Sequence, residues 1–493
     1  MKPIPLLGTG FKTYASIASS QTRMNLFYDL REDGDKSAVV AFSRSGLTDS
    51  LAKNPNIVSD VYGMYATKSF FYLLAYETAH TVELFKCDGS SAPVSLYDAG
   101  EVAMTGPLFS IADNGTQLLV VDGGGTKGNV YDLTAGSAFL SQATLPTPLV
   151  QITGLNSKLY GIDGGSRNFY QSAVGDATAW TSPTIYGTKE AKSDFCTLVK
   201  ELNGLLVVGG RQSIEYWQDI GAYPLSVQRI NGATKNLGIG HTSSFAYVGD
   251  GAACILRDNS GVFAVYYMTG TSINKISDGD VERILSSVLQ GDTALSTNLT
   301  STVYSDNGHT IYEINSVYLG YRLAYDFTSQ VWSTTSGVYP LTHSANLNGI
   351  TYLSAYAAGN AILKVNDGSG VDVLNSVNHT IPLELTTKHV HTGSNELFVS
   401  QLGVEVQGDY SDSVNIYLSV SRDGGYNFGT PKQKRMYVYP LSGTPSPGTV
   451  PPRVVWRRLG RGRDFAFKFS ISDARSTRAV LTGINIQVES AID

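Results

Sequence analysis

The sequence predicts an all-β protein: a six- or seven-bladed β-propeller with an additional C-terminal β-sandwich domain. Charged residues make up 16% of the 493 residues, against roughly 25% in an average domain, whereas glycine (51) and tyrosine (29) are abundant. Hydrophobic runs separated by turns recur between Val61 and Asp367, and a strictly alternating run follows near the C-terminus. Few charges, many turns and many aromatic residues are typical of an all-β chain with extensive buried or shared surface.

The recurring unit is a hydrophobic run, a turn of the Asn-Gly or Asp-Gly type and a second hydrophobic run. It returns about every 35–50 residues, roughly the length of a propeller blade. Asn-Gly and Asp-Gly favour tight hairpins because they accept positive φ angles. Units this small cannot bury their own faces, so we expect them to stack radially into a propeller. The turns lie at Asn114-Gly115, Asn156-Ser157, Asn203-Gly204, Asp250-Gly251, Asn307-Gly308 and Asn348-Gly349.

Three domains are expected. Residues 1–50 form an N-terminal arm whose strands pack near the C-terminal domain, residues 51–375 form the propeller, and residues 376–493 form the sandwich. One helical insertion near residues 279–290 interrupts the propeller, because its apolar residues follow the i, i+3, i+4, i+7 spacing of one helix face. We expect this insertion to pack on the propeller or on a neighbouring subunit.

The C-terminal domain combines an alternating strand with a basic edge. Phe465, Phe467, Phe469 and Ile471 alternate with polar or small residues, as in a strand with one buried face. Between Arg422 and Arg478, twelve Lys or Arg stand against three Asp or Glu, although the whole chain has a net charge of −6 and the remaining residues hold 24 basic and 39 acidic side chains. Such a chain is too acidic for a general nucleic-acid binder. The basic segment is expected to dock on an acidic partner surface, with a solvated sheet edge as the alternative.

A proline-rich loop at residues 440–452 lies between strands of the same domain. Five of its thirteen residues are proline and two are glycine, so it cannot continue a ladder of strand hydrogen bonds. A long loop inside a small domain is often a binding element. In a closed ring of subunits, we expect this loop to lie on the neighbouring copy.

Motifs for catalysis or cofactor binding are scarce, and we expect neither an enzyme nor a cofactor. The sequence contains no Gly-x-Ser-x-Gly elbow, no His-Glu-x-x-His and no Walker-type loop. His389 and His391 could seat a metal, but surface or interface histidines are the favoured reading, so no metal site is expected. Three distant cysteines predict isolated core thiols in a reducing cytoplasm, and neither a signal peptide nor a membrane anchor is expected.

Three separated motifs, in order, span nearly the whole chain. The first is Arg23-Met24-Asn25-Leu26-Phe27, the second Ser213-Ile214-Glu215-Tyr216-Trp217, and the third joins the turn from Ser421 to Phe428 with Trp456-Arg457-Arg458-Leu459-Gly460-Arg461-Gly462-Arg463. Together they resemble the packaged-DNA stabilisation proteins, which are the tail hub, or nozzle, proteins of short-tailed bacteriophages (podoviruses). One stretch departs from the family. Arg44-Ser45-Gly46-Leu47 stands where the family often has a Pro-Gly-hydrophobic turn.

The resemblance implies a structural protein of the virion tail that is assembled in the cytoplasm of the bacterial host. It implies a homo-hexameric tube below the portal and its adaptor (the head-to-tail connector). Such a tube retains packaged double-stranded DNA, carries tail spikes or fibres and a tail plug or needle, and conducts DNA at ejection. The residues expected at the adaptor or subunit interface are Arg23, Asn25, Arg453, Trp456, Arg457, Arg458, Arg461 and Arg463.

The turn from Ser421 to Phe428 also resembles the Asp-box hairpin of sialidases and other carbohydrate-active propellers. In that hairpin the aspartate caps backbone amides, which is a structural role. The residues expected to build the turn are Ser421, Asp423, Gly425 and Phe428. The alternative function is therefore a carbohydrate-binding or carbohydrate-cleaving propeller of the virion, lectin-like or sialidase-like. Retaining sialidases also need an arginine cluster at the centre of the propeller. The propeller repeats of this chain carry only scattered single arginines, which weakens the interpretation as a sialidase.

Overall fold

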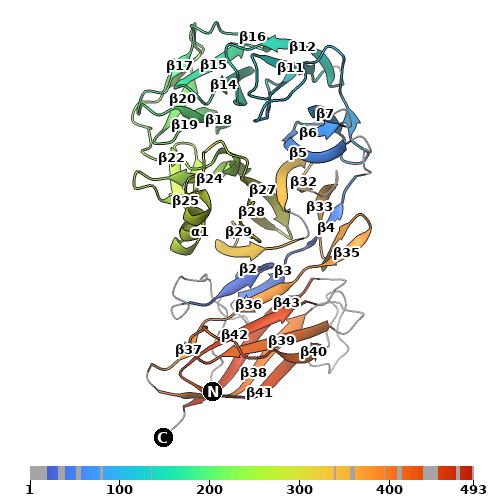
Figure 1. Cartoon of the computed structure of the whole chain (residues 1–493), viewed down its shortest axis with the longest axis vertical. Helices are drawn as coiled ribbons and strands as arrows, with labels where there is room; N and C mark the ends of the chain where they lie inside the picture. Colours follow the sequence, from blue (N-terminus) through green and yellow to red (C-terminus); the bar gives the residue numbers. More distant parts are fainter. Residues whose placement is uncertain are drawn as a thin grey trace.

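In the structure, a computed structural model, the regular elements of the described residues are almost all strands (Figure 1). It describes residues 19–30, 39–51, 57–77, 82–134, 136–337, 340–355, 361–393, 395–407, 414–436, 453–472 and 478–490. Strands account for 58% and helix for 3% of the structure. The predicted fold class, a propeller followed by a sandwich, is confirmed. The proline-rich loop predicted at residues 440–452 lies outside the described residues.

Within the described residues, seven sheets follow one another along the chain. The first contains β5 (Ile57–Ala66), β6 (Phe71–Glu77), β7 (Val82–Cys87) and β8 (Val94–Ser95). The second contains β9 (Ser110–Asp113), β10 (Gln117–Val121), β11 (Lys127–Asp132) and β12 (Ala138–Thr144). The third contains β13 (Gln151–Leu155), β14 (Lys158–Ile162), β15 (Asn168–Ala173), β16 (Asp176–Trp180) and the short β17 (Gly187–Thr188).

The remaining propeller sheets continue the same order. The fourth contains β18 (Cys196–Leu202), β19 (Leu205–Gly210), β20 (Ile214–Asp219) and β21 (Val227–Arg229). The fifth contains β22 (Gly238–Ile239), β23 (Ala246–Val248), β24 (Gly251–Arg257), β25 (Phe263–Thr269) and β26 (Ser272–Lys275), with the 3-10 turn η1 (Thr242–Ser244) before β23. The sixth contains β27 (Leu299–Asp306), β28 (His309–Ser316), β29 (Arg322–Asp326) and β30 (Val331–Thr335). The seventh contains β31 (Leu341–Leu347), β32 (Ile350–Ala355), β33 (Ile362–Asn366), β4 (Gly46–Asp49), β34 (Val371–Leu374) and β35 (Val377–Thr380).

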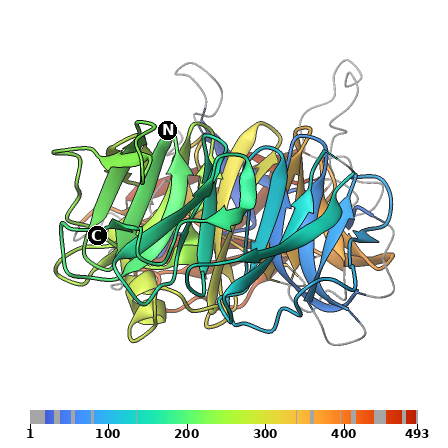
Figure 2. The same ribbon diagram turned by 90° about the horizontal axis from the view of Figure 1, so that it is seen from above.

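These sheets close into a ring, seen face-on in the upper part of Figure 1 and edge-on in Figure 2. Consecutive sheets are in contact along the chain, and β31 of the seventh sheet contacts β5 of the first. The contacts between consecutive sheets are β5 with β9, β9 with β13, β13 with β18, β19 with β22, β23 with β27 and β27 with β31. The seventh sheet also takes β4 from near the N-terminus, which pairs antiparallel with β33. Strands from both ends of the propeller sequence therefore pair in the seventh sheet and close the ring.

Three of the predicted Asn-Gly turns have the expected backbone. Asn203, Asn307 and Asn348 have φ angles of 52°, 50° and 53°, and the glycine after each also has a positive φ. Two successive positive φ angles are what a two-residue hairpin of type I′ requires. The Asn-Gly pairs therefore join β18 to β19, β27 to β28 and β31 to β32.

The helix α1 (Gly279–Leu289) begins at Asp278, whose side chain accepts hydrogen bonds from the amides of Asp280 and Val281. Its buried face packs against β25 and the core of the fifth and sixth sheets, so it covers the propeller of its own chain. The buried residues are Val281, Ile284, Leu285, Val288 and Leu289. Within the described residues, the structure contains no helix of sufficient length and apolarity to span a membrane.

The sandwich lies below the propeller in Figure 1 and has two sheets. One has the order β2 (Leu26–Leu30), β3 (Val39–Ser43), β43 (Val480–Ser490), β38 (Leu397–Gln407) and β41 (Arg453–Gly462). The other has the order β36 (Leu383–Thr386), β42 (Asp464–Ile471), β39 (Val414–Ser421) and β40 (Lys432–Met436), with β37 (Val390–His391) beside β42. Phe465, Phe467, Phe469 and Ile471 are buried between them, as their alternation predicted.

The strand β1 (Thr22–Met24) connects the two domains. It pairs parallel with β30 of the propeller and antiparallel with β36 of the sandwich. One sheet therefore continues from the sixth propeller sheet through β1 into the sandwich and ends at β40.

Candidate partner-binding edge of the sandwich

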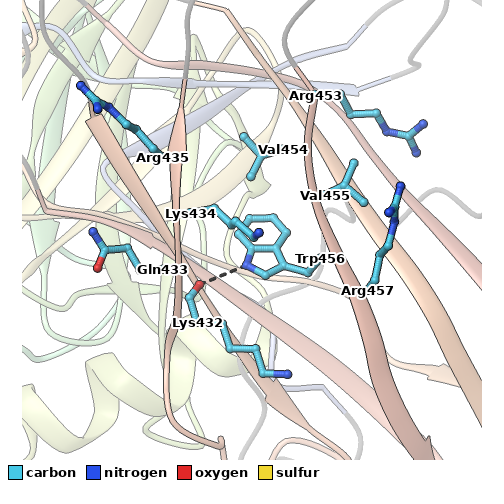
Figure 3. Close-up of a pocket in the computed structure, with 9 residues that line it drawn as sticks. All are labelled: Lys432, Gln433, Lys434, Arg435, Arg453, Val454, Val455, Trp456 and Arg457. Carbon is cyan, nitrogen blue, oxygen red and sulfur yellow. Dashed lines mark hydrogen bonds between the residues drawn. The ribbon is translucent and has the colours of Figure 1, made fainter.

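The two edge strands β40 and β41 face each other at one open side of the sandwich. Among the residues that the structure describes, β40 pairs with β39 alone and β41 with β38 alone. Between them lies a groove of about 730 Å³, which we call the sandwich seam (Figure 3). It is lined by residues 432–435 of β40 and 453–457 of β41.

The sandwich seam is strongly basic. Its described lining includes Lys432, Lys434, Arg435, Arg453 and Arg457, all of them exposed, and contains no Asp or Glu. Like charges along one groove repel one another, and a negatively charged partner would relieve this repulsion. The prediction of a basic edge on this domain thus corresponds to a defined groove.

Trp456 is the floor of the seam and not an exposed anchor. Its side chain is 3% exposed, packs against Phe469 with ring centroids 5.9 Å apart, and belongs to the sandwich core. Its indole nitrogen donates to the carbonyl oxygen of Lys432 at 3.1 Å, which ties β41 to β40 (Figure 3). Trp456 thus lines the seam as part of the sandwich core, and its place at an adaptor or subunit interface stays a prediction.

Beyond the seam, β41 bends. Arg458 and Gly460 have φ angles of 58° and 95°, and the pairing with β38 shifts register between Val399 and Gln401. This bulge leaves the consecutive residues Arg457 and Arg458 both exposed. Arg461 and Arg463 follow it and are also exposed, so the arginines predicted at an interface lie on both sides of the bulge.

The turn that starts at Ser421 is held by its own side chains. Ser421 Oγ accepts from the amide of Gly425 at 2.9 Å, and Asp423 Oδ1 accepts from the amide of Asn427 at 3.0 Å. The hydrogen bond from Ser421 is the main reason that the pKa of Asp423 lies below its ordinary value. Gly425 has a φ of 81°, which favours glycine, and Phe428 is half-buried. These bonds are structural and close the hairpin between β39 and β40.

Arg23 and Asn25 are buried at the junction of the domains, with exposed fractions of 1% and 0%. Arg23 Nε and Nη2 donate to the carbonyl of Trp332 at 3.2 and 2.5 Å. Asn25 donates to the carbonyl of Pro382 at 2.7 Å and accepts from the amide of Ser336 at 2.7 Å. Their polar groups serve contacts within one chain, and their place at a partner interface stays a prediction.

A buried ion pair at this junction was not foreseen. The guanidinium of Arg44 binds both carboxylate oxygens of Asp372, at 2.8 and 2.6 Å, and every N–H of this guanidinium has an acceptor. Burial alone lowers the pKa of Arg44, but the charge of Asp372 raises it above its ordinary value. Position 46 requires glycine, because an added Cβ would lie 1.8 Å from the carbonyl oxygen of Val371. The stretch that departs from the family motif is therefore a structural anchor.

A second unforeseen cluster fastens the described start of the chain to the sandwich. Ser20 Oγ lies 2.9 Å from His389 Nε2, and His389 Nδ1 lies 3.1 Å from Asp464 Oδ2. Ser20 is 5% exposed and lies under Gly425, where an added Cβ would approach Ser20 Oγ to 2.6 Å. Both ring nitrogens of His389 thus have protein partners, whereas His391 is exposed. Within the described residues, no group of three or more metal-ligating side chains could hold an ion.

Comparisons with known proteins match both domains. Residues 83–356 match a family model described as "Bacteriophage P22 Gp10, beta-propeller", and residues 382–489 match one described as "Bacteriophage P22 Gp10, beta-sandwich". A search of curated proteins gave no match.

Solved structures similar to this chain include several propellers at low identity. Dihydro-heme d1 dehydrogenase NirN is 10% identical over 71% of this chain and 69% of its own, with a TM-score of 0.42. A streptogramin B lyase is 10% identical over 66% of this chain and 98% of its own, with a TM-score of 0.41. BamB from Moraxella catarrhalis is 12% identical over 70% of this chain and 97% of its own, with a TM-score of 0.37.

Proposed function

Because family models match both of its domains, the chain belongs to the bacteriophage P22 Gp10 family, and we propose that it is the tail hub, or nozzle, of a short-tailed phage. In this proposal, six copies close into a tube below the portal and its adaptor. The tube retains packaged DNA, carries spikes or fibres and a plug or needle, and conducts DNA at ejection. The observation that carries the proposal is the match of propeller and sandwich in one chain, in the same order.

The charge distribution supports this role. Outside residues 422–478, the chain holds 24 basic and 39 acidic residues, so most of the subunit repels DNA. A basic groove inside the channel would instead attract phosphates and slow the passage of DNA. We therefore place the sandwich seam and the arginines beyond it on the adaptor side, where they bind an acidic surface. The role requires no catalytic step, and we propose that the protein is not an enzyme.

The location in the virion tests the proposal directly. Electron-microscopy class averages of native tails, labelled with an antibody against this chain, should show label on a six-fold tube below the portal. Native tails are the appropriate sample because an isolated subunit has no ring template. Label on peripheral appendages would instead favour the carbohydrate-binding alternative and would overturn the nozzle proposal.

Charge reversal tests the adaptor-facing surface. We expect a variant with Arg457→Glu, Arg458→Glu, Arg461→Glu and Arg463→Glu to lose attachment to adaptor-bearing particles that lack tails. All four side chains are exposed, so the fold should be retained. The matched control makes the same charge change at exposed propeller positions: Lys68→Glu, Lys127→Glu, Arg167→Glu and Arg211→Glu. Attachment of both variants at the wild-type level would contradict the proposed docking surface.

A further inference from the structure

We propose that the sandwich seam receives an extended acidic segment of another virion protein, which pairs with β40 as an added strand. The inference rests on the proposed function only where it states that the partner is a virion protein. Its chemistry follows from the backbone of β40 and from the side chains that line the seam.

Among the described strands, none pairs with β40 on the side of the seam. β40 pairs with β39 from Val414 opposite Met436 to Leu418 opposite Lys432. The carbonyl of Lys432 accepts the indole N–H of Trp456, so it points away from β39 and into the seam. In an antiparallel strand, every second residue directs both its N–H and its C=O to the same side. The N–H and C=O of Lys434 therefore also point into the seam and can pair with another strand.

The side chains around this edge select negative charge. In the part of the chain that the structure describes, no hydrogen bond or ion pair links the side chains of Lys432, Lys434, Arg453 and Arg457 to an acceptor. The two lysines come from the strand that would pair, and the two arginines line the seam from β41 (Figure 3). Val454 and Trp456 point into the sandwich core, so Arg453 and Arg457, which alternate with them, lie on the opposite face of β41. A strand added to β40 directs alternate side chains to each face of its sheet, and glutamate or aspartate on the face of Lys432 and Lys434 would meet these two cations.

An extended peptide fits the seam better than nucleic acid. Phosphates could pair with the cations, but a nucleic acid has no ladder of N–H and C=O groups to match Lys434. A helix would satisfy its own backbone groups and offer none to β40. Strand addition uses both the backbone groups of β40 and the basic side chains of the seam. The main-chain hydrogen bonds supply affinity, and the alternating side chains supply specificity.

The test measures binding of a synthetic peptide to the purified full-length chain. The probe is a fluorescein-labelled ten-residue peptide of alternating glutamate and valine, followed by fluorescence polarisation at low and physiological salt. The control peptide has the same sequence with N-methylated amides at every second position, which blocks strand pairing but keeps the charge. We expect the first peptide to bind and the N-methylated peptide to bind at least tenfold more weakly.

Two double variants distinguish binding at the seam from non-specific electrostatic attraction between the peptide and the chain. Lys432→Glu combined with Lys434→Glu should weaken binding of the peptide at least tenfold, whereas the control Lys127→Glu with Arg211→Glu should leave it within about twofold. Circular dichroism and thermal unfolding check that both variants are folded. Equal binding of the two peptides, equal binding by both variants, or tighter binding of a DNA oligonucleotide of the same charge would each overturn the inference. Hydrogen exchange should show new protection at Lys434 when the peptide is bound.

These results are independent of the location test. A chain that binds the peptide but labels peripheral appendages would retain this inference and refute the nozzle. Label on the tail tube without peptide binding would retain the nozzle and refute strand addition.

Discussion

Replacing Asp372 with asparagine tests whether the buried ion pair holds the N-terminal arm to the propeller. Asp372 accepts from Arg44 at 2.8 and 2.6 Å and from the amide of Leu47 at 2.8 Å. The side chains of Arg44 and Asp372 are 1% and 3% exposed. Asparagine has nearly the same shape but no charge. The guanidinium of Arg44 then stays buried without a counter-ion.

The expected cost follows from this burial. Removing one partner of a buried pair typically costs about 3–5 kcal/mol. We expect about 3 kcal/mol, the lower end of that range, because the amide oxygen of asparagine can still accept one bond and other acceptors of Arg44 remain. The matched control is Glu190→Gln, since Glu190 is 66% exposed and lies 3.7 Å from Arg229. Exposed pairs contribute about 0–1 kcal/mol.

Urea unfolding at pH 7 gives the free energy, and hydrogen exchange in β1, β4 and β34 shows where stability is lost. The local measurement is needed because chains with several domains often unfold in more than one step. Replacing both partners, with Arg44→Met and Asp372→Leu, should recover much of the loss because no unpaired charge remains. A loss below 1 kcal/mol for Asp372→Asn, equal to that of Glu190→Gln, would refute the reasoning.

The same pair predicts a dependence on pH. Burial alone would raise the pKa of Asp372, but the charge of Arg44 holds it below its ordinary value. A carboxyl whose pKa is lowered on folding stabilises the fold above its unfolded pKa, about 3.9, and this stability is lost as pH falls through the folded pKa. The wild type should therefore lose the contribution of this pair only below about pH 4, whereas Asp372→Asn lacks it at every pH.

Three further predictions concern buried groups. Burial lowers the pKa of His241 to about 4, so its unfolding binds a proton between about pH 6.5 and 4 and should lower stability by about 1.4 kcal/mol per pH unit as pH decreases. Burial lowers the pKa of His343 to about 4 as well, so His241→Gln should reduce the slope in urea titrations by the share of one histidine and His343→Gln by the other. Trp456→Phe should cost about 0.5–1.5 kcal/mol for the lost hydrogen bond to Lys432, and Trp456→Ala about 3–5 kcal/mol, while Trp456→Phe should leave attachment to adaptor-bearing particles unchanged. Gly46→Ala should cost about 1–3 kcal/mol in thermal or urea unfolding, because its methyl group meets the backbone of β34, whereas Gly115→Ala meets open space but needs a positive φ and should cost about 1 kcal/mol.

Local patterns were sufficient to predict much of the fold. The alternation at Phe465, Phe467 and Phe469 identified a strand with one buried face, and Asn-Gly pairs identified hairpins, because both signals depend only on near neighbours. The basic edge was also foreseen, since charge can be counted along the chain.

The burial of single motif residues was not predictable in the same way. Arg23, Asn25 and Trp456 belong to recognisable motifs, and a motif alone does not say which side of a strand is covered. Arg44 and Asp372 are 328 residues apart, so their pairing depends on the path of β4 and β34 through the seventh sheet. The available signal in the sequence was that residues 44–47 depart from the family motif. Arg44 stands where the family often has a Pro-Gly turn, and an arginine at such a position needs an acceptor nearby.

The continuous sheet joins the sandwich seam to the propeller mechanically. A strand added to β40 extends a sheet that runs through β39, β42, β36 and β1 to β30. Any hinge between the domains would have to break the pairing of β1 with β30 or with β36, and Arg23, Asn25 and Arg44 bury their polar groups on both sides of that strand. A force that a partner applies at the seam would therefore act on the hydrogen bonds between the strands of this sheet. It would not act on a flexible linker. In a subunit that is proposed to resist the pressure of packaged DNA, the buried polar groups of Arg23, Asn25 and Arg44 would hold the two domains together under this load.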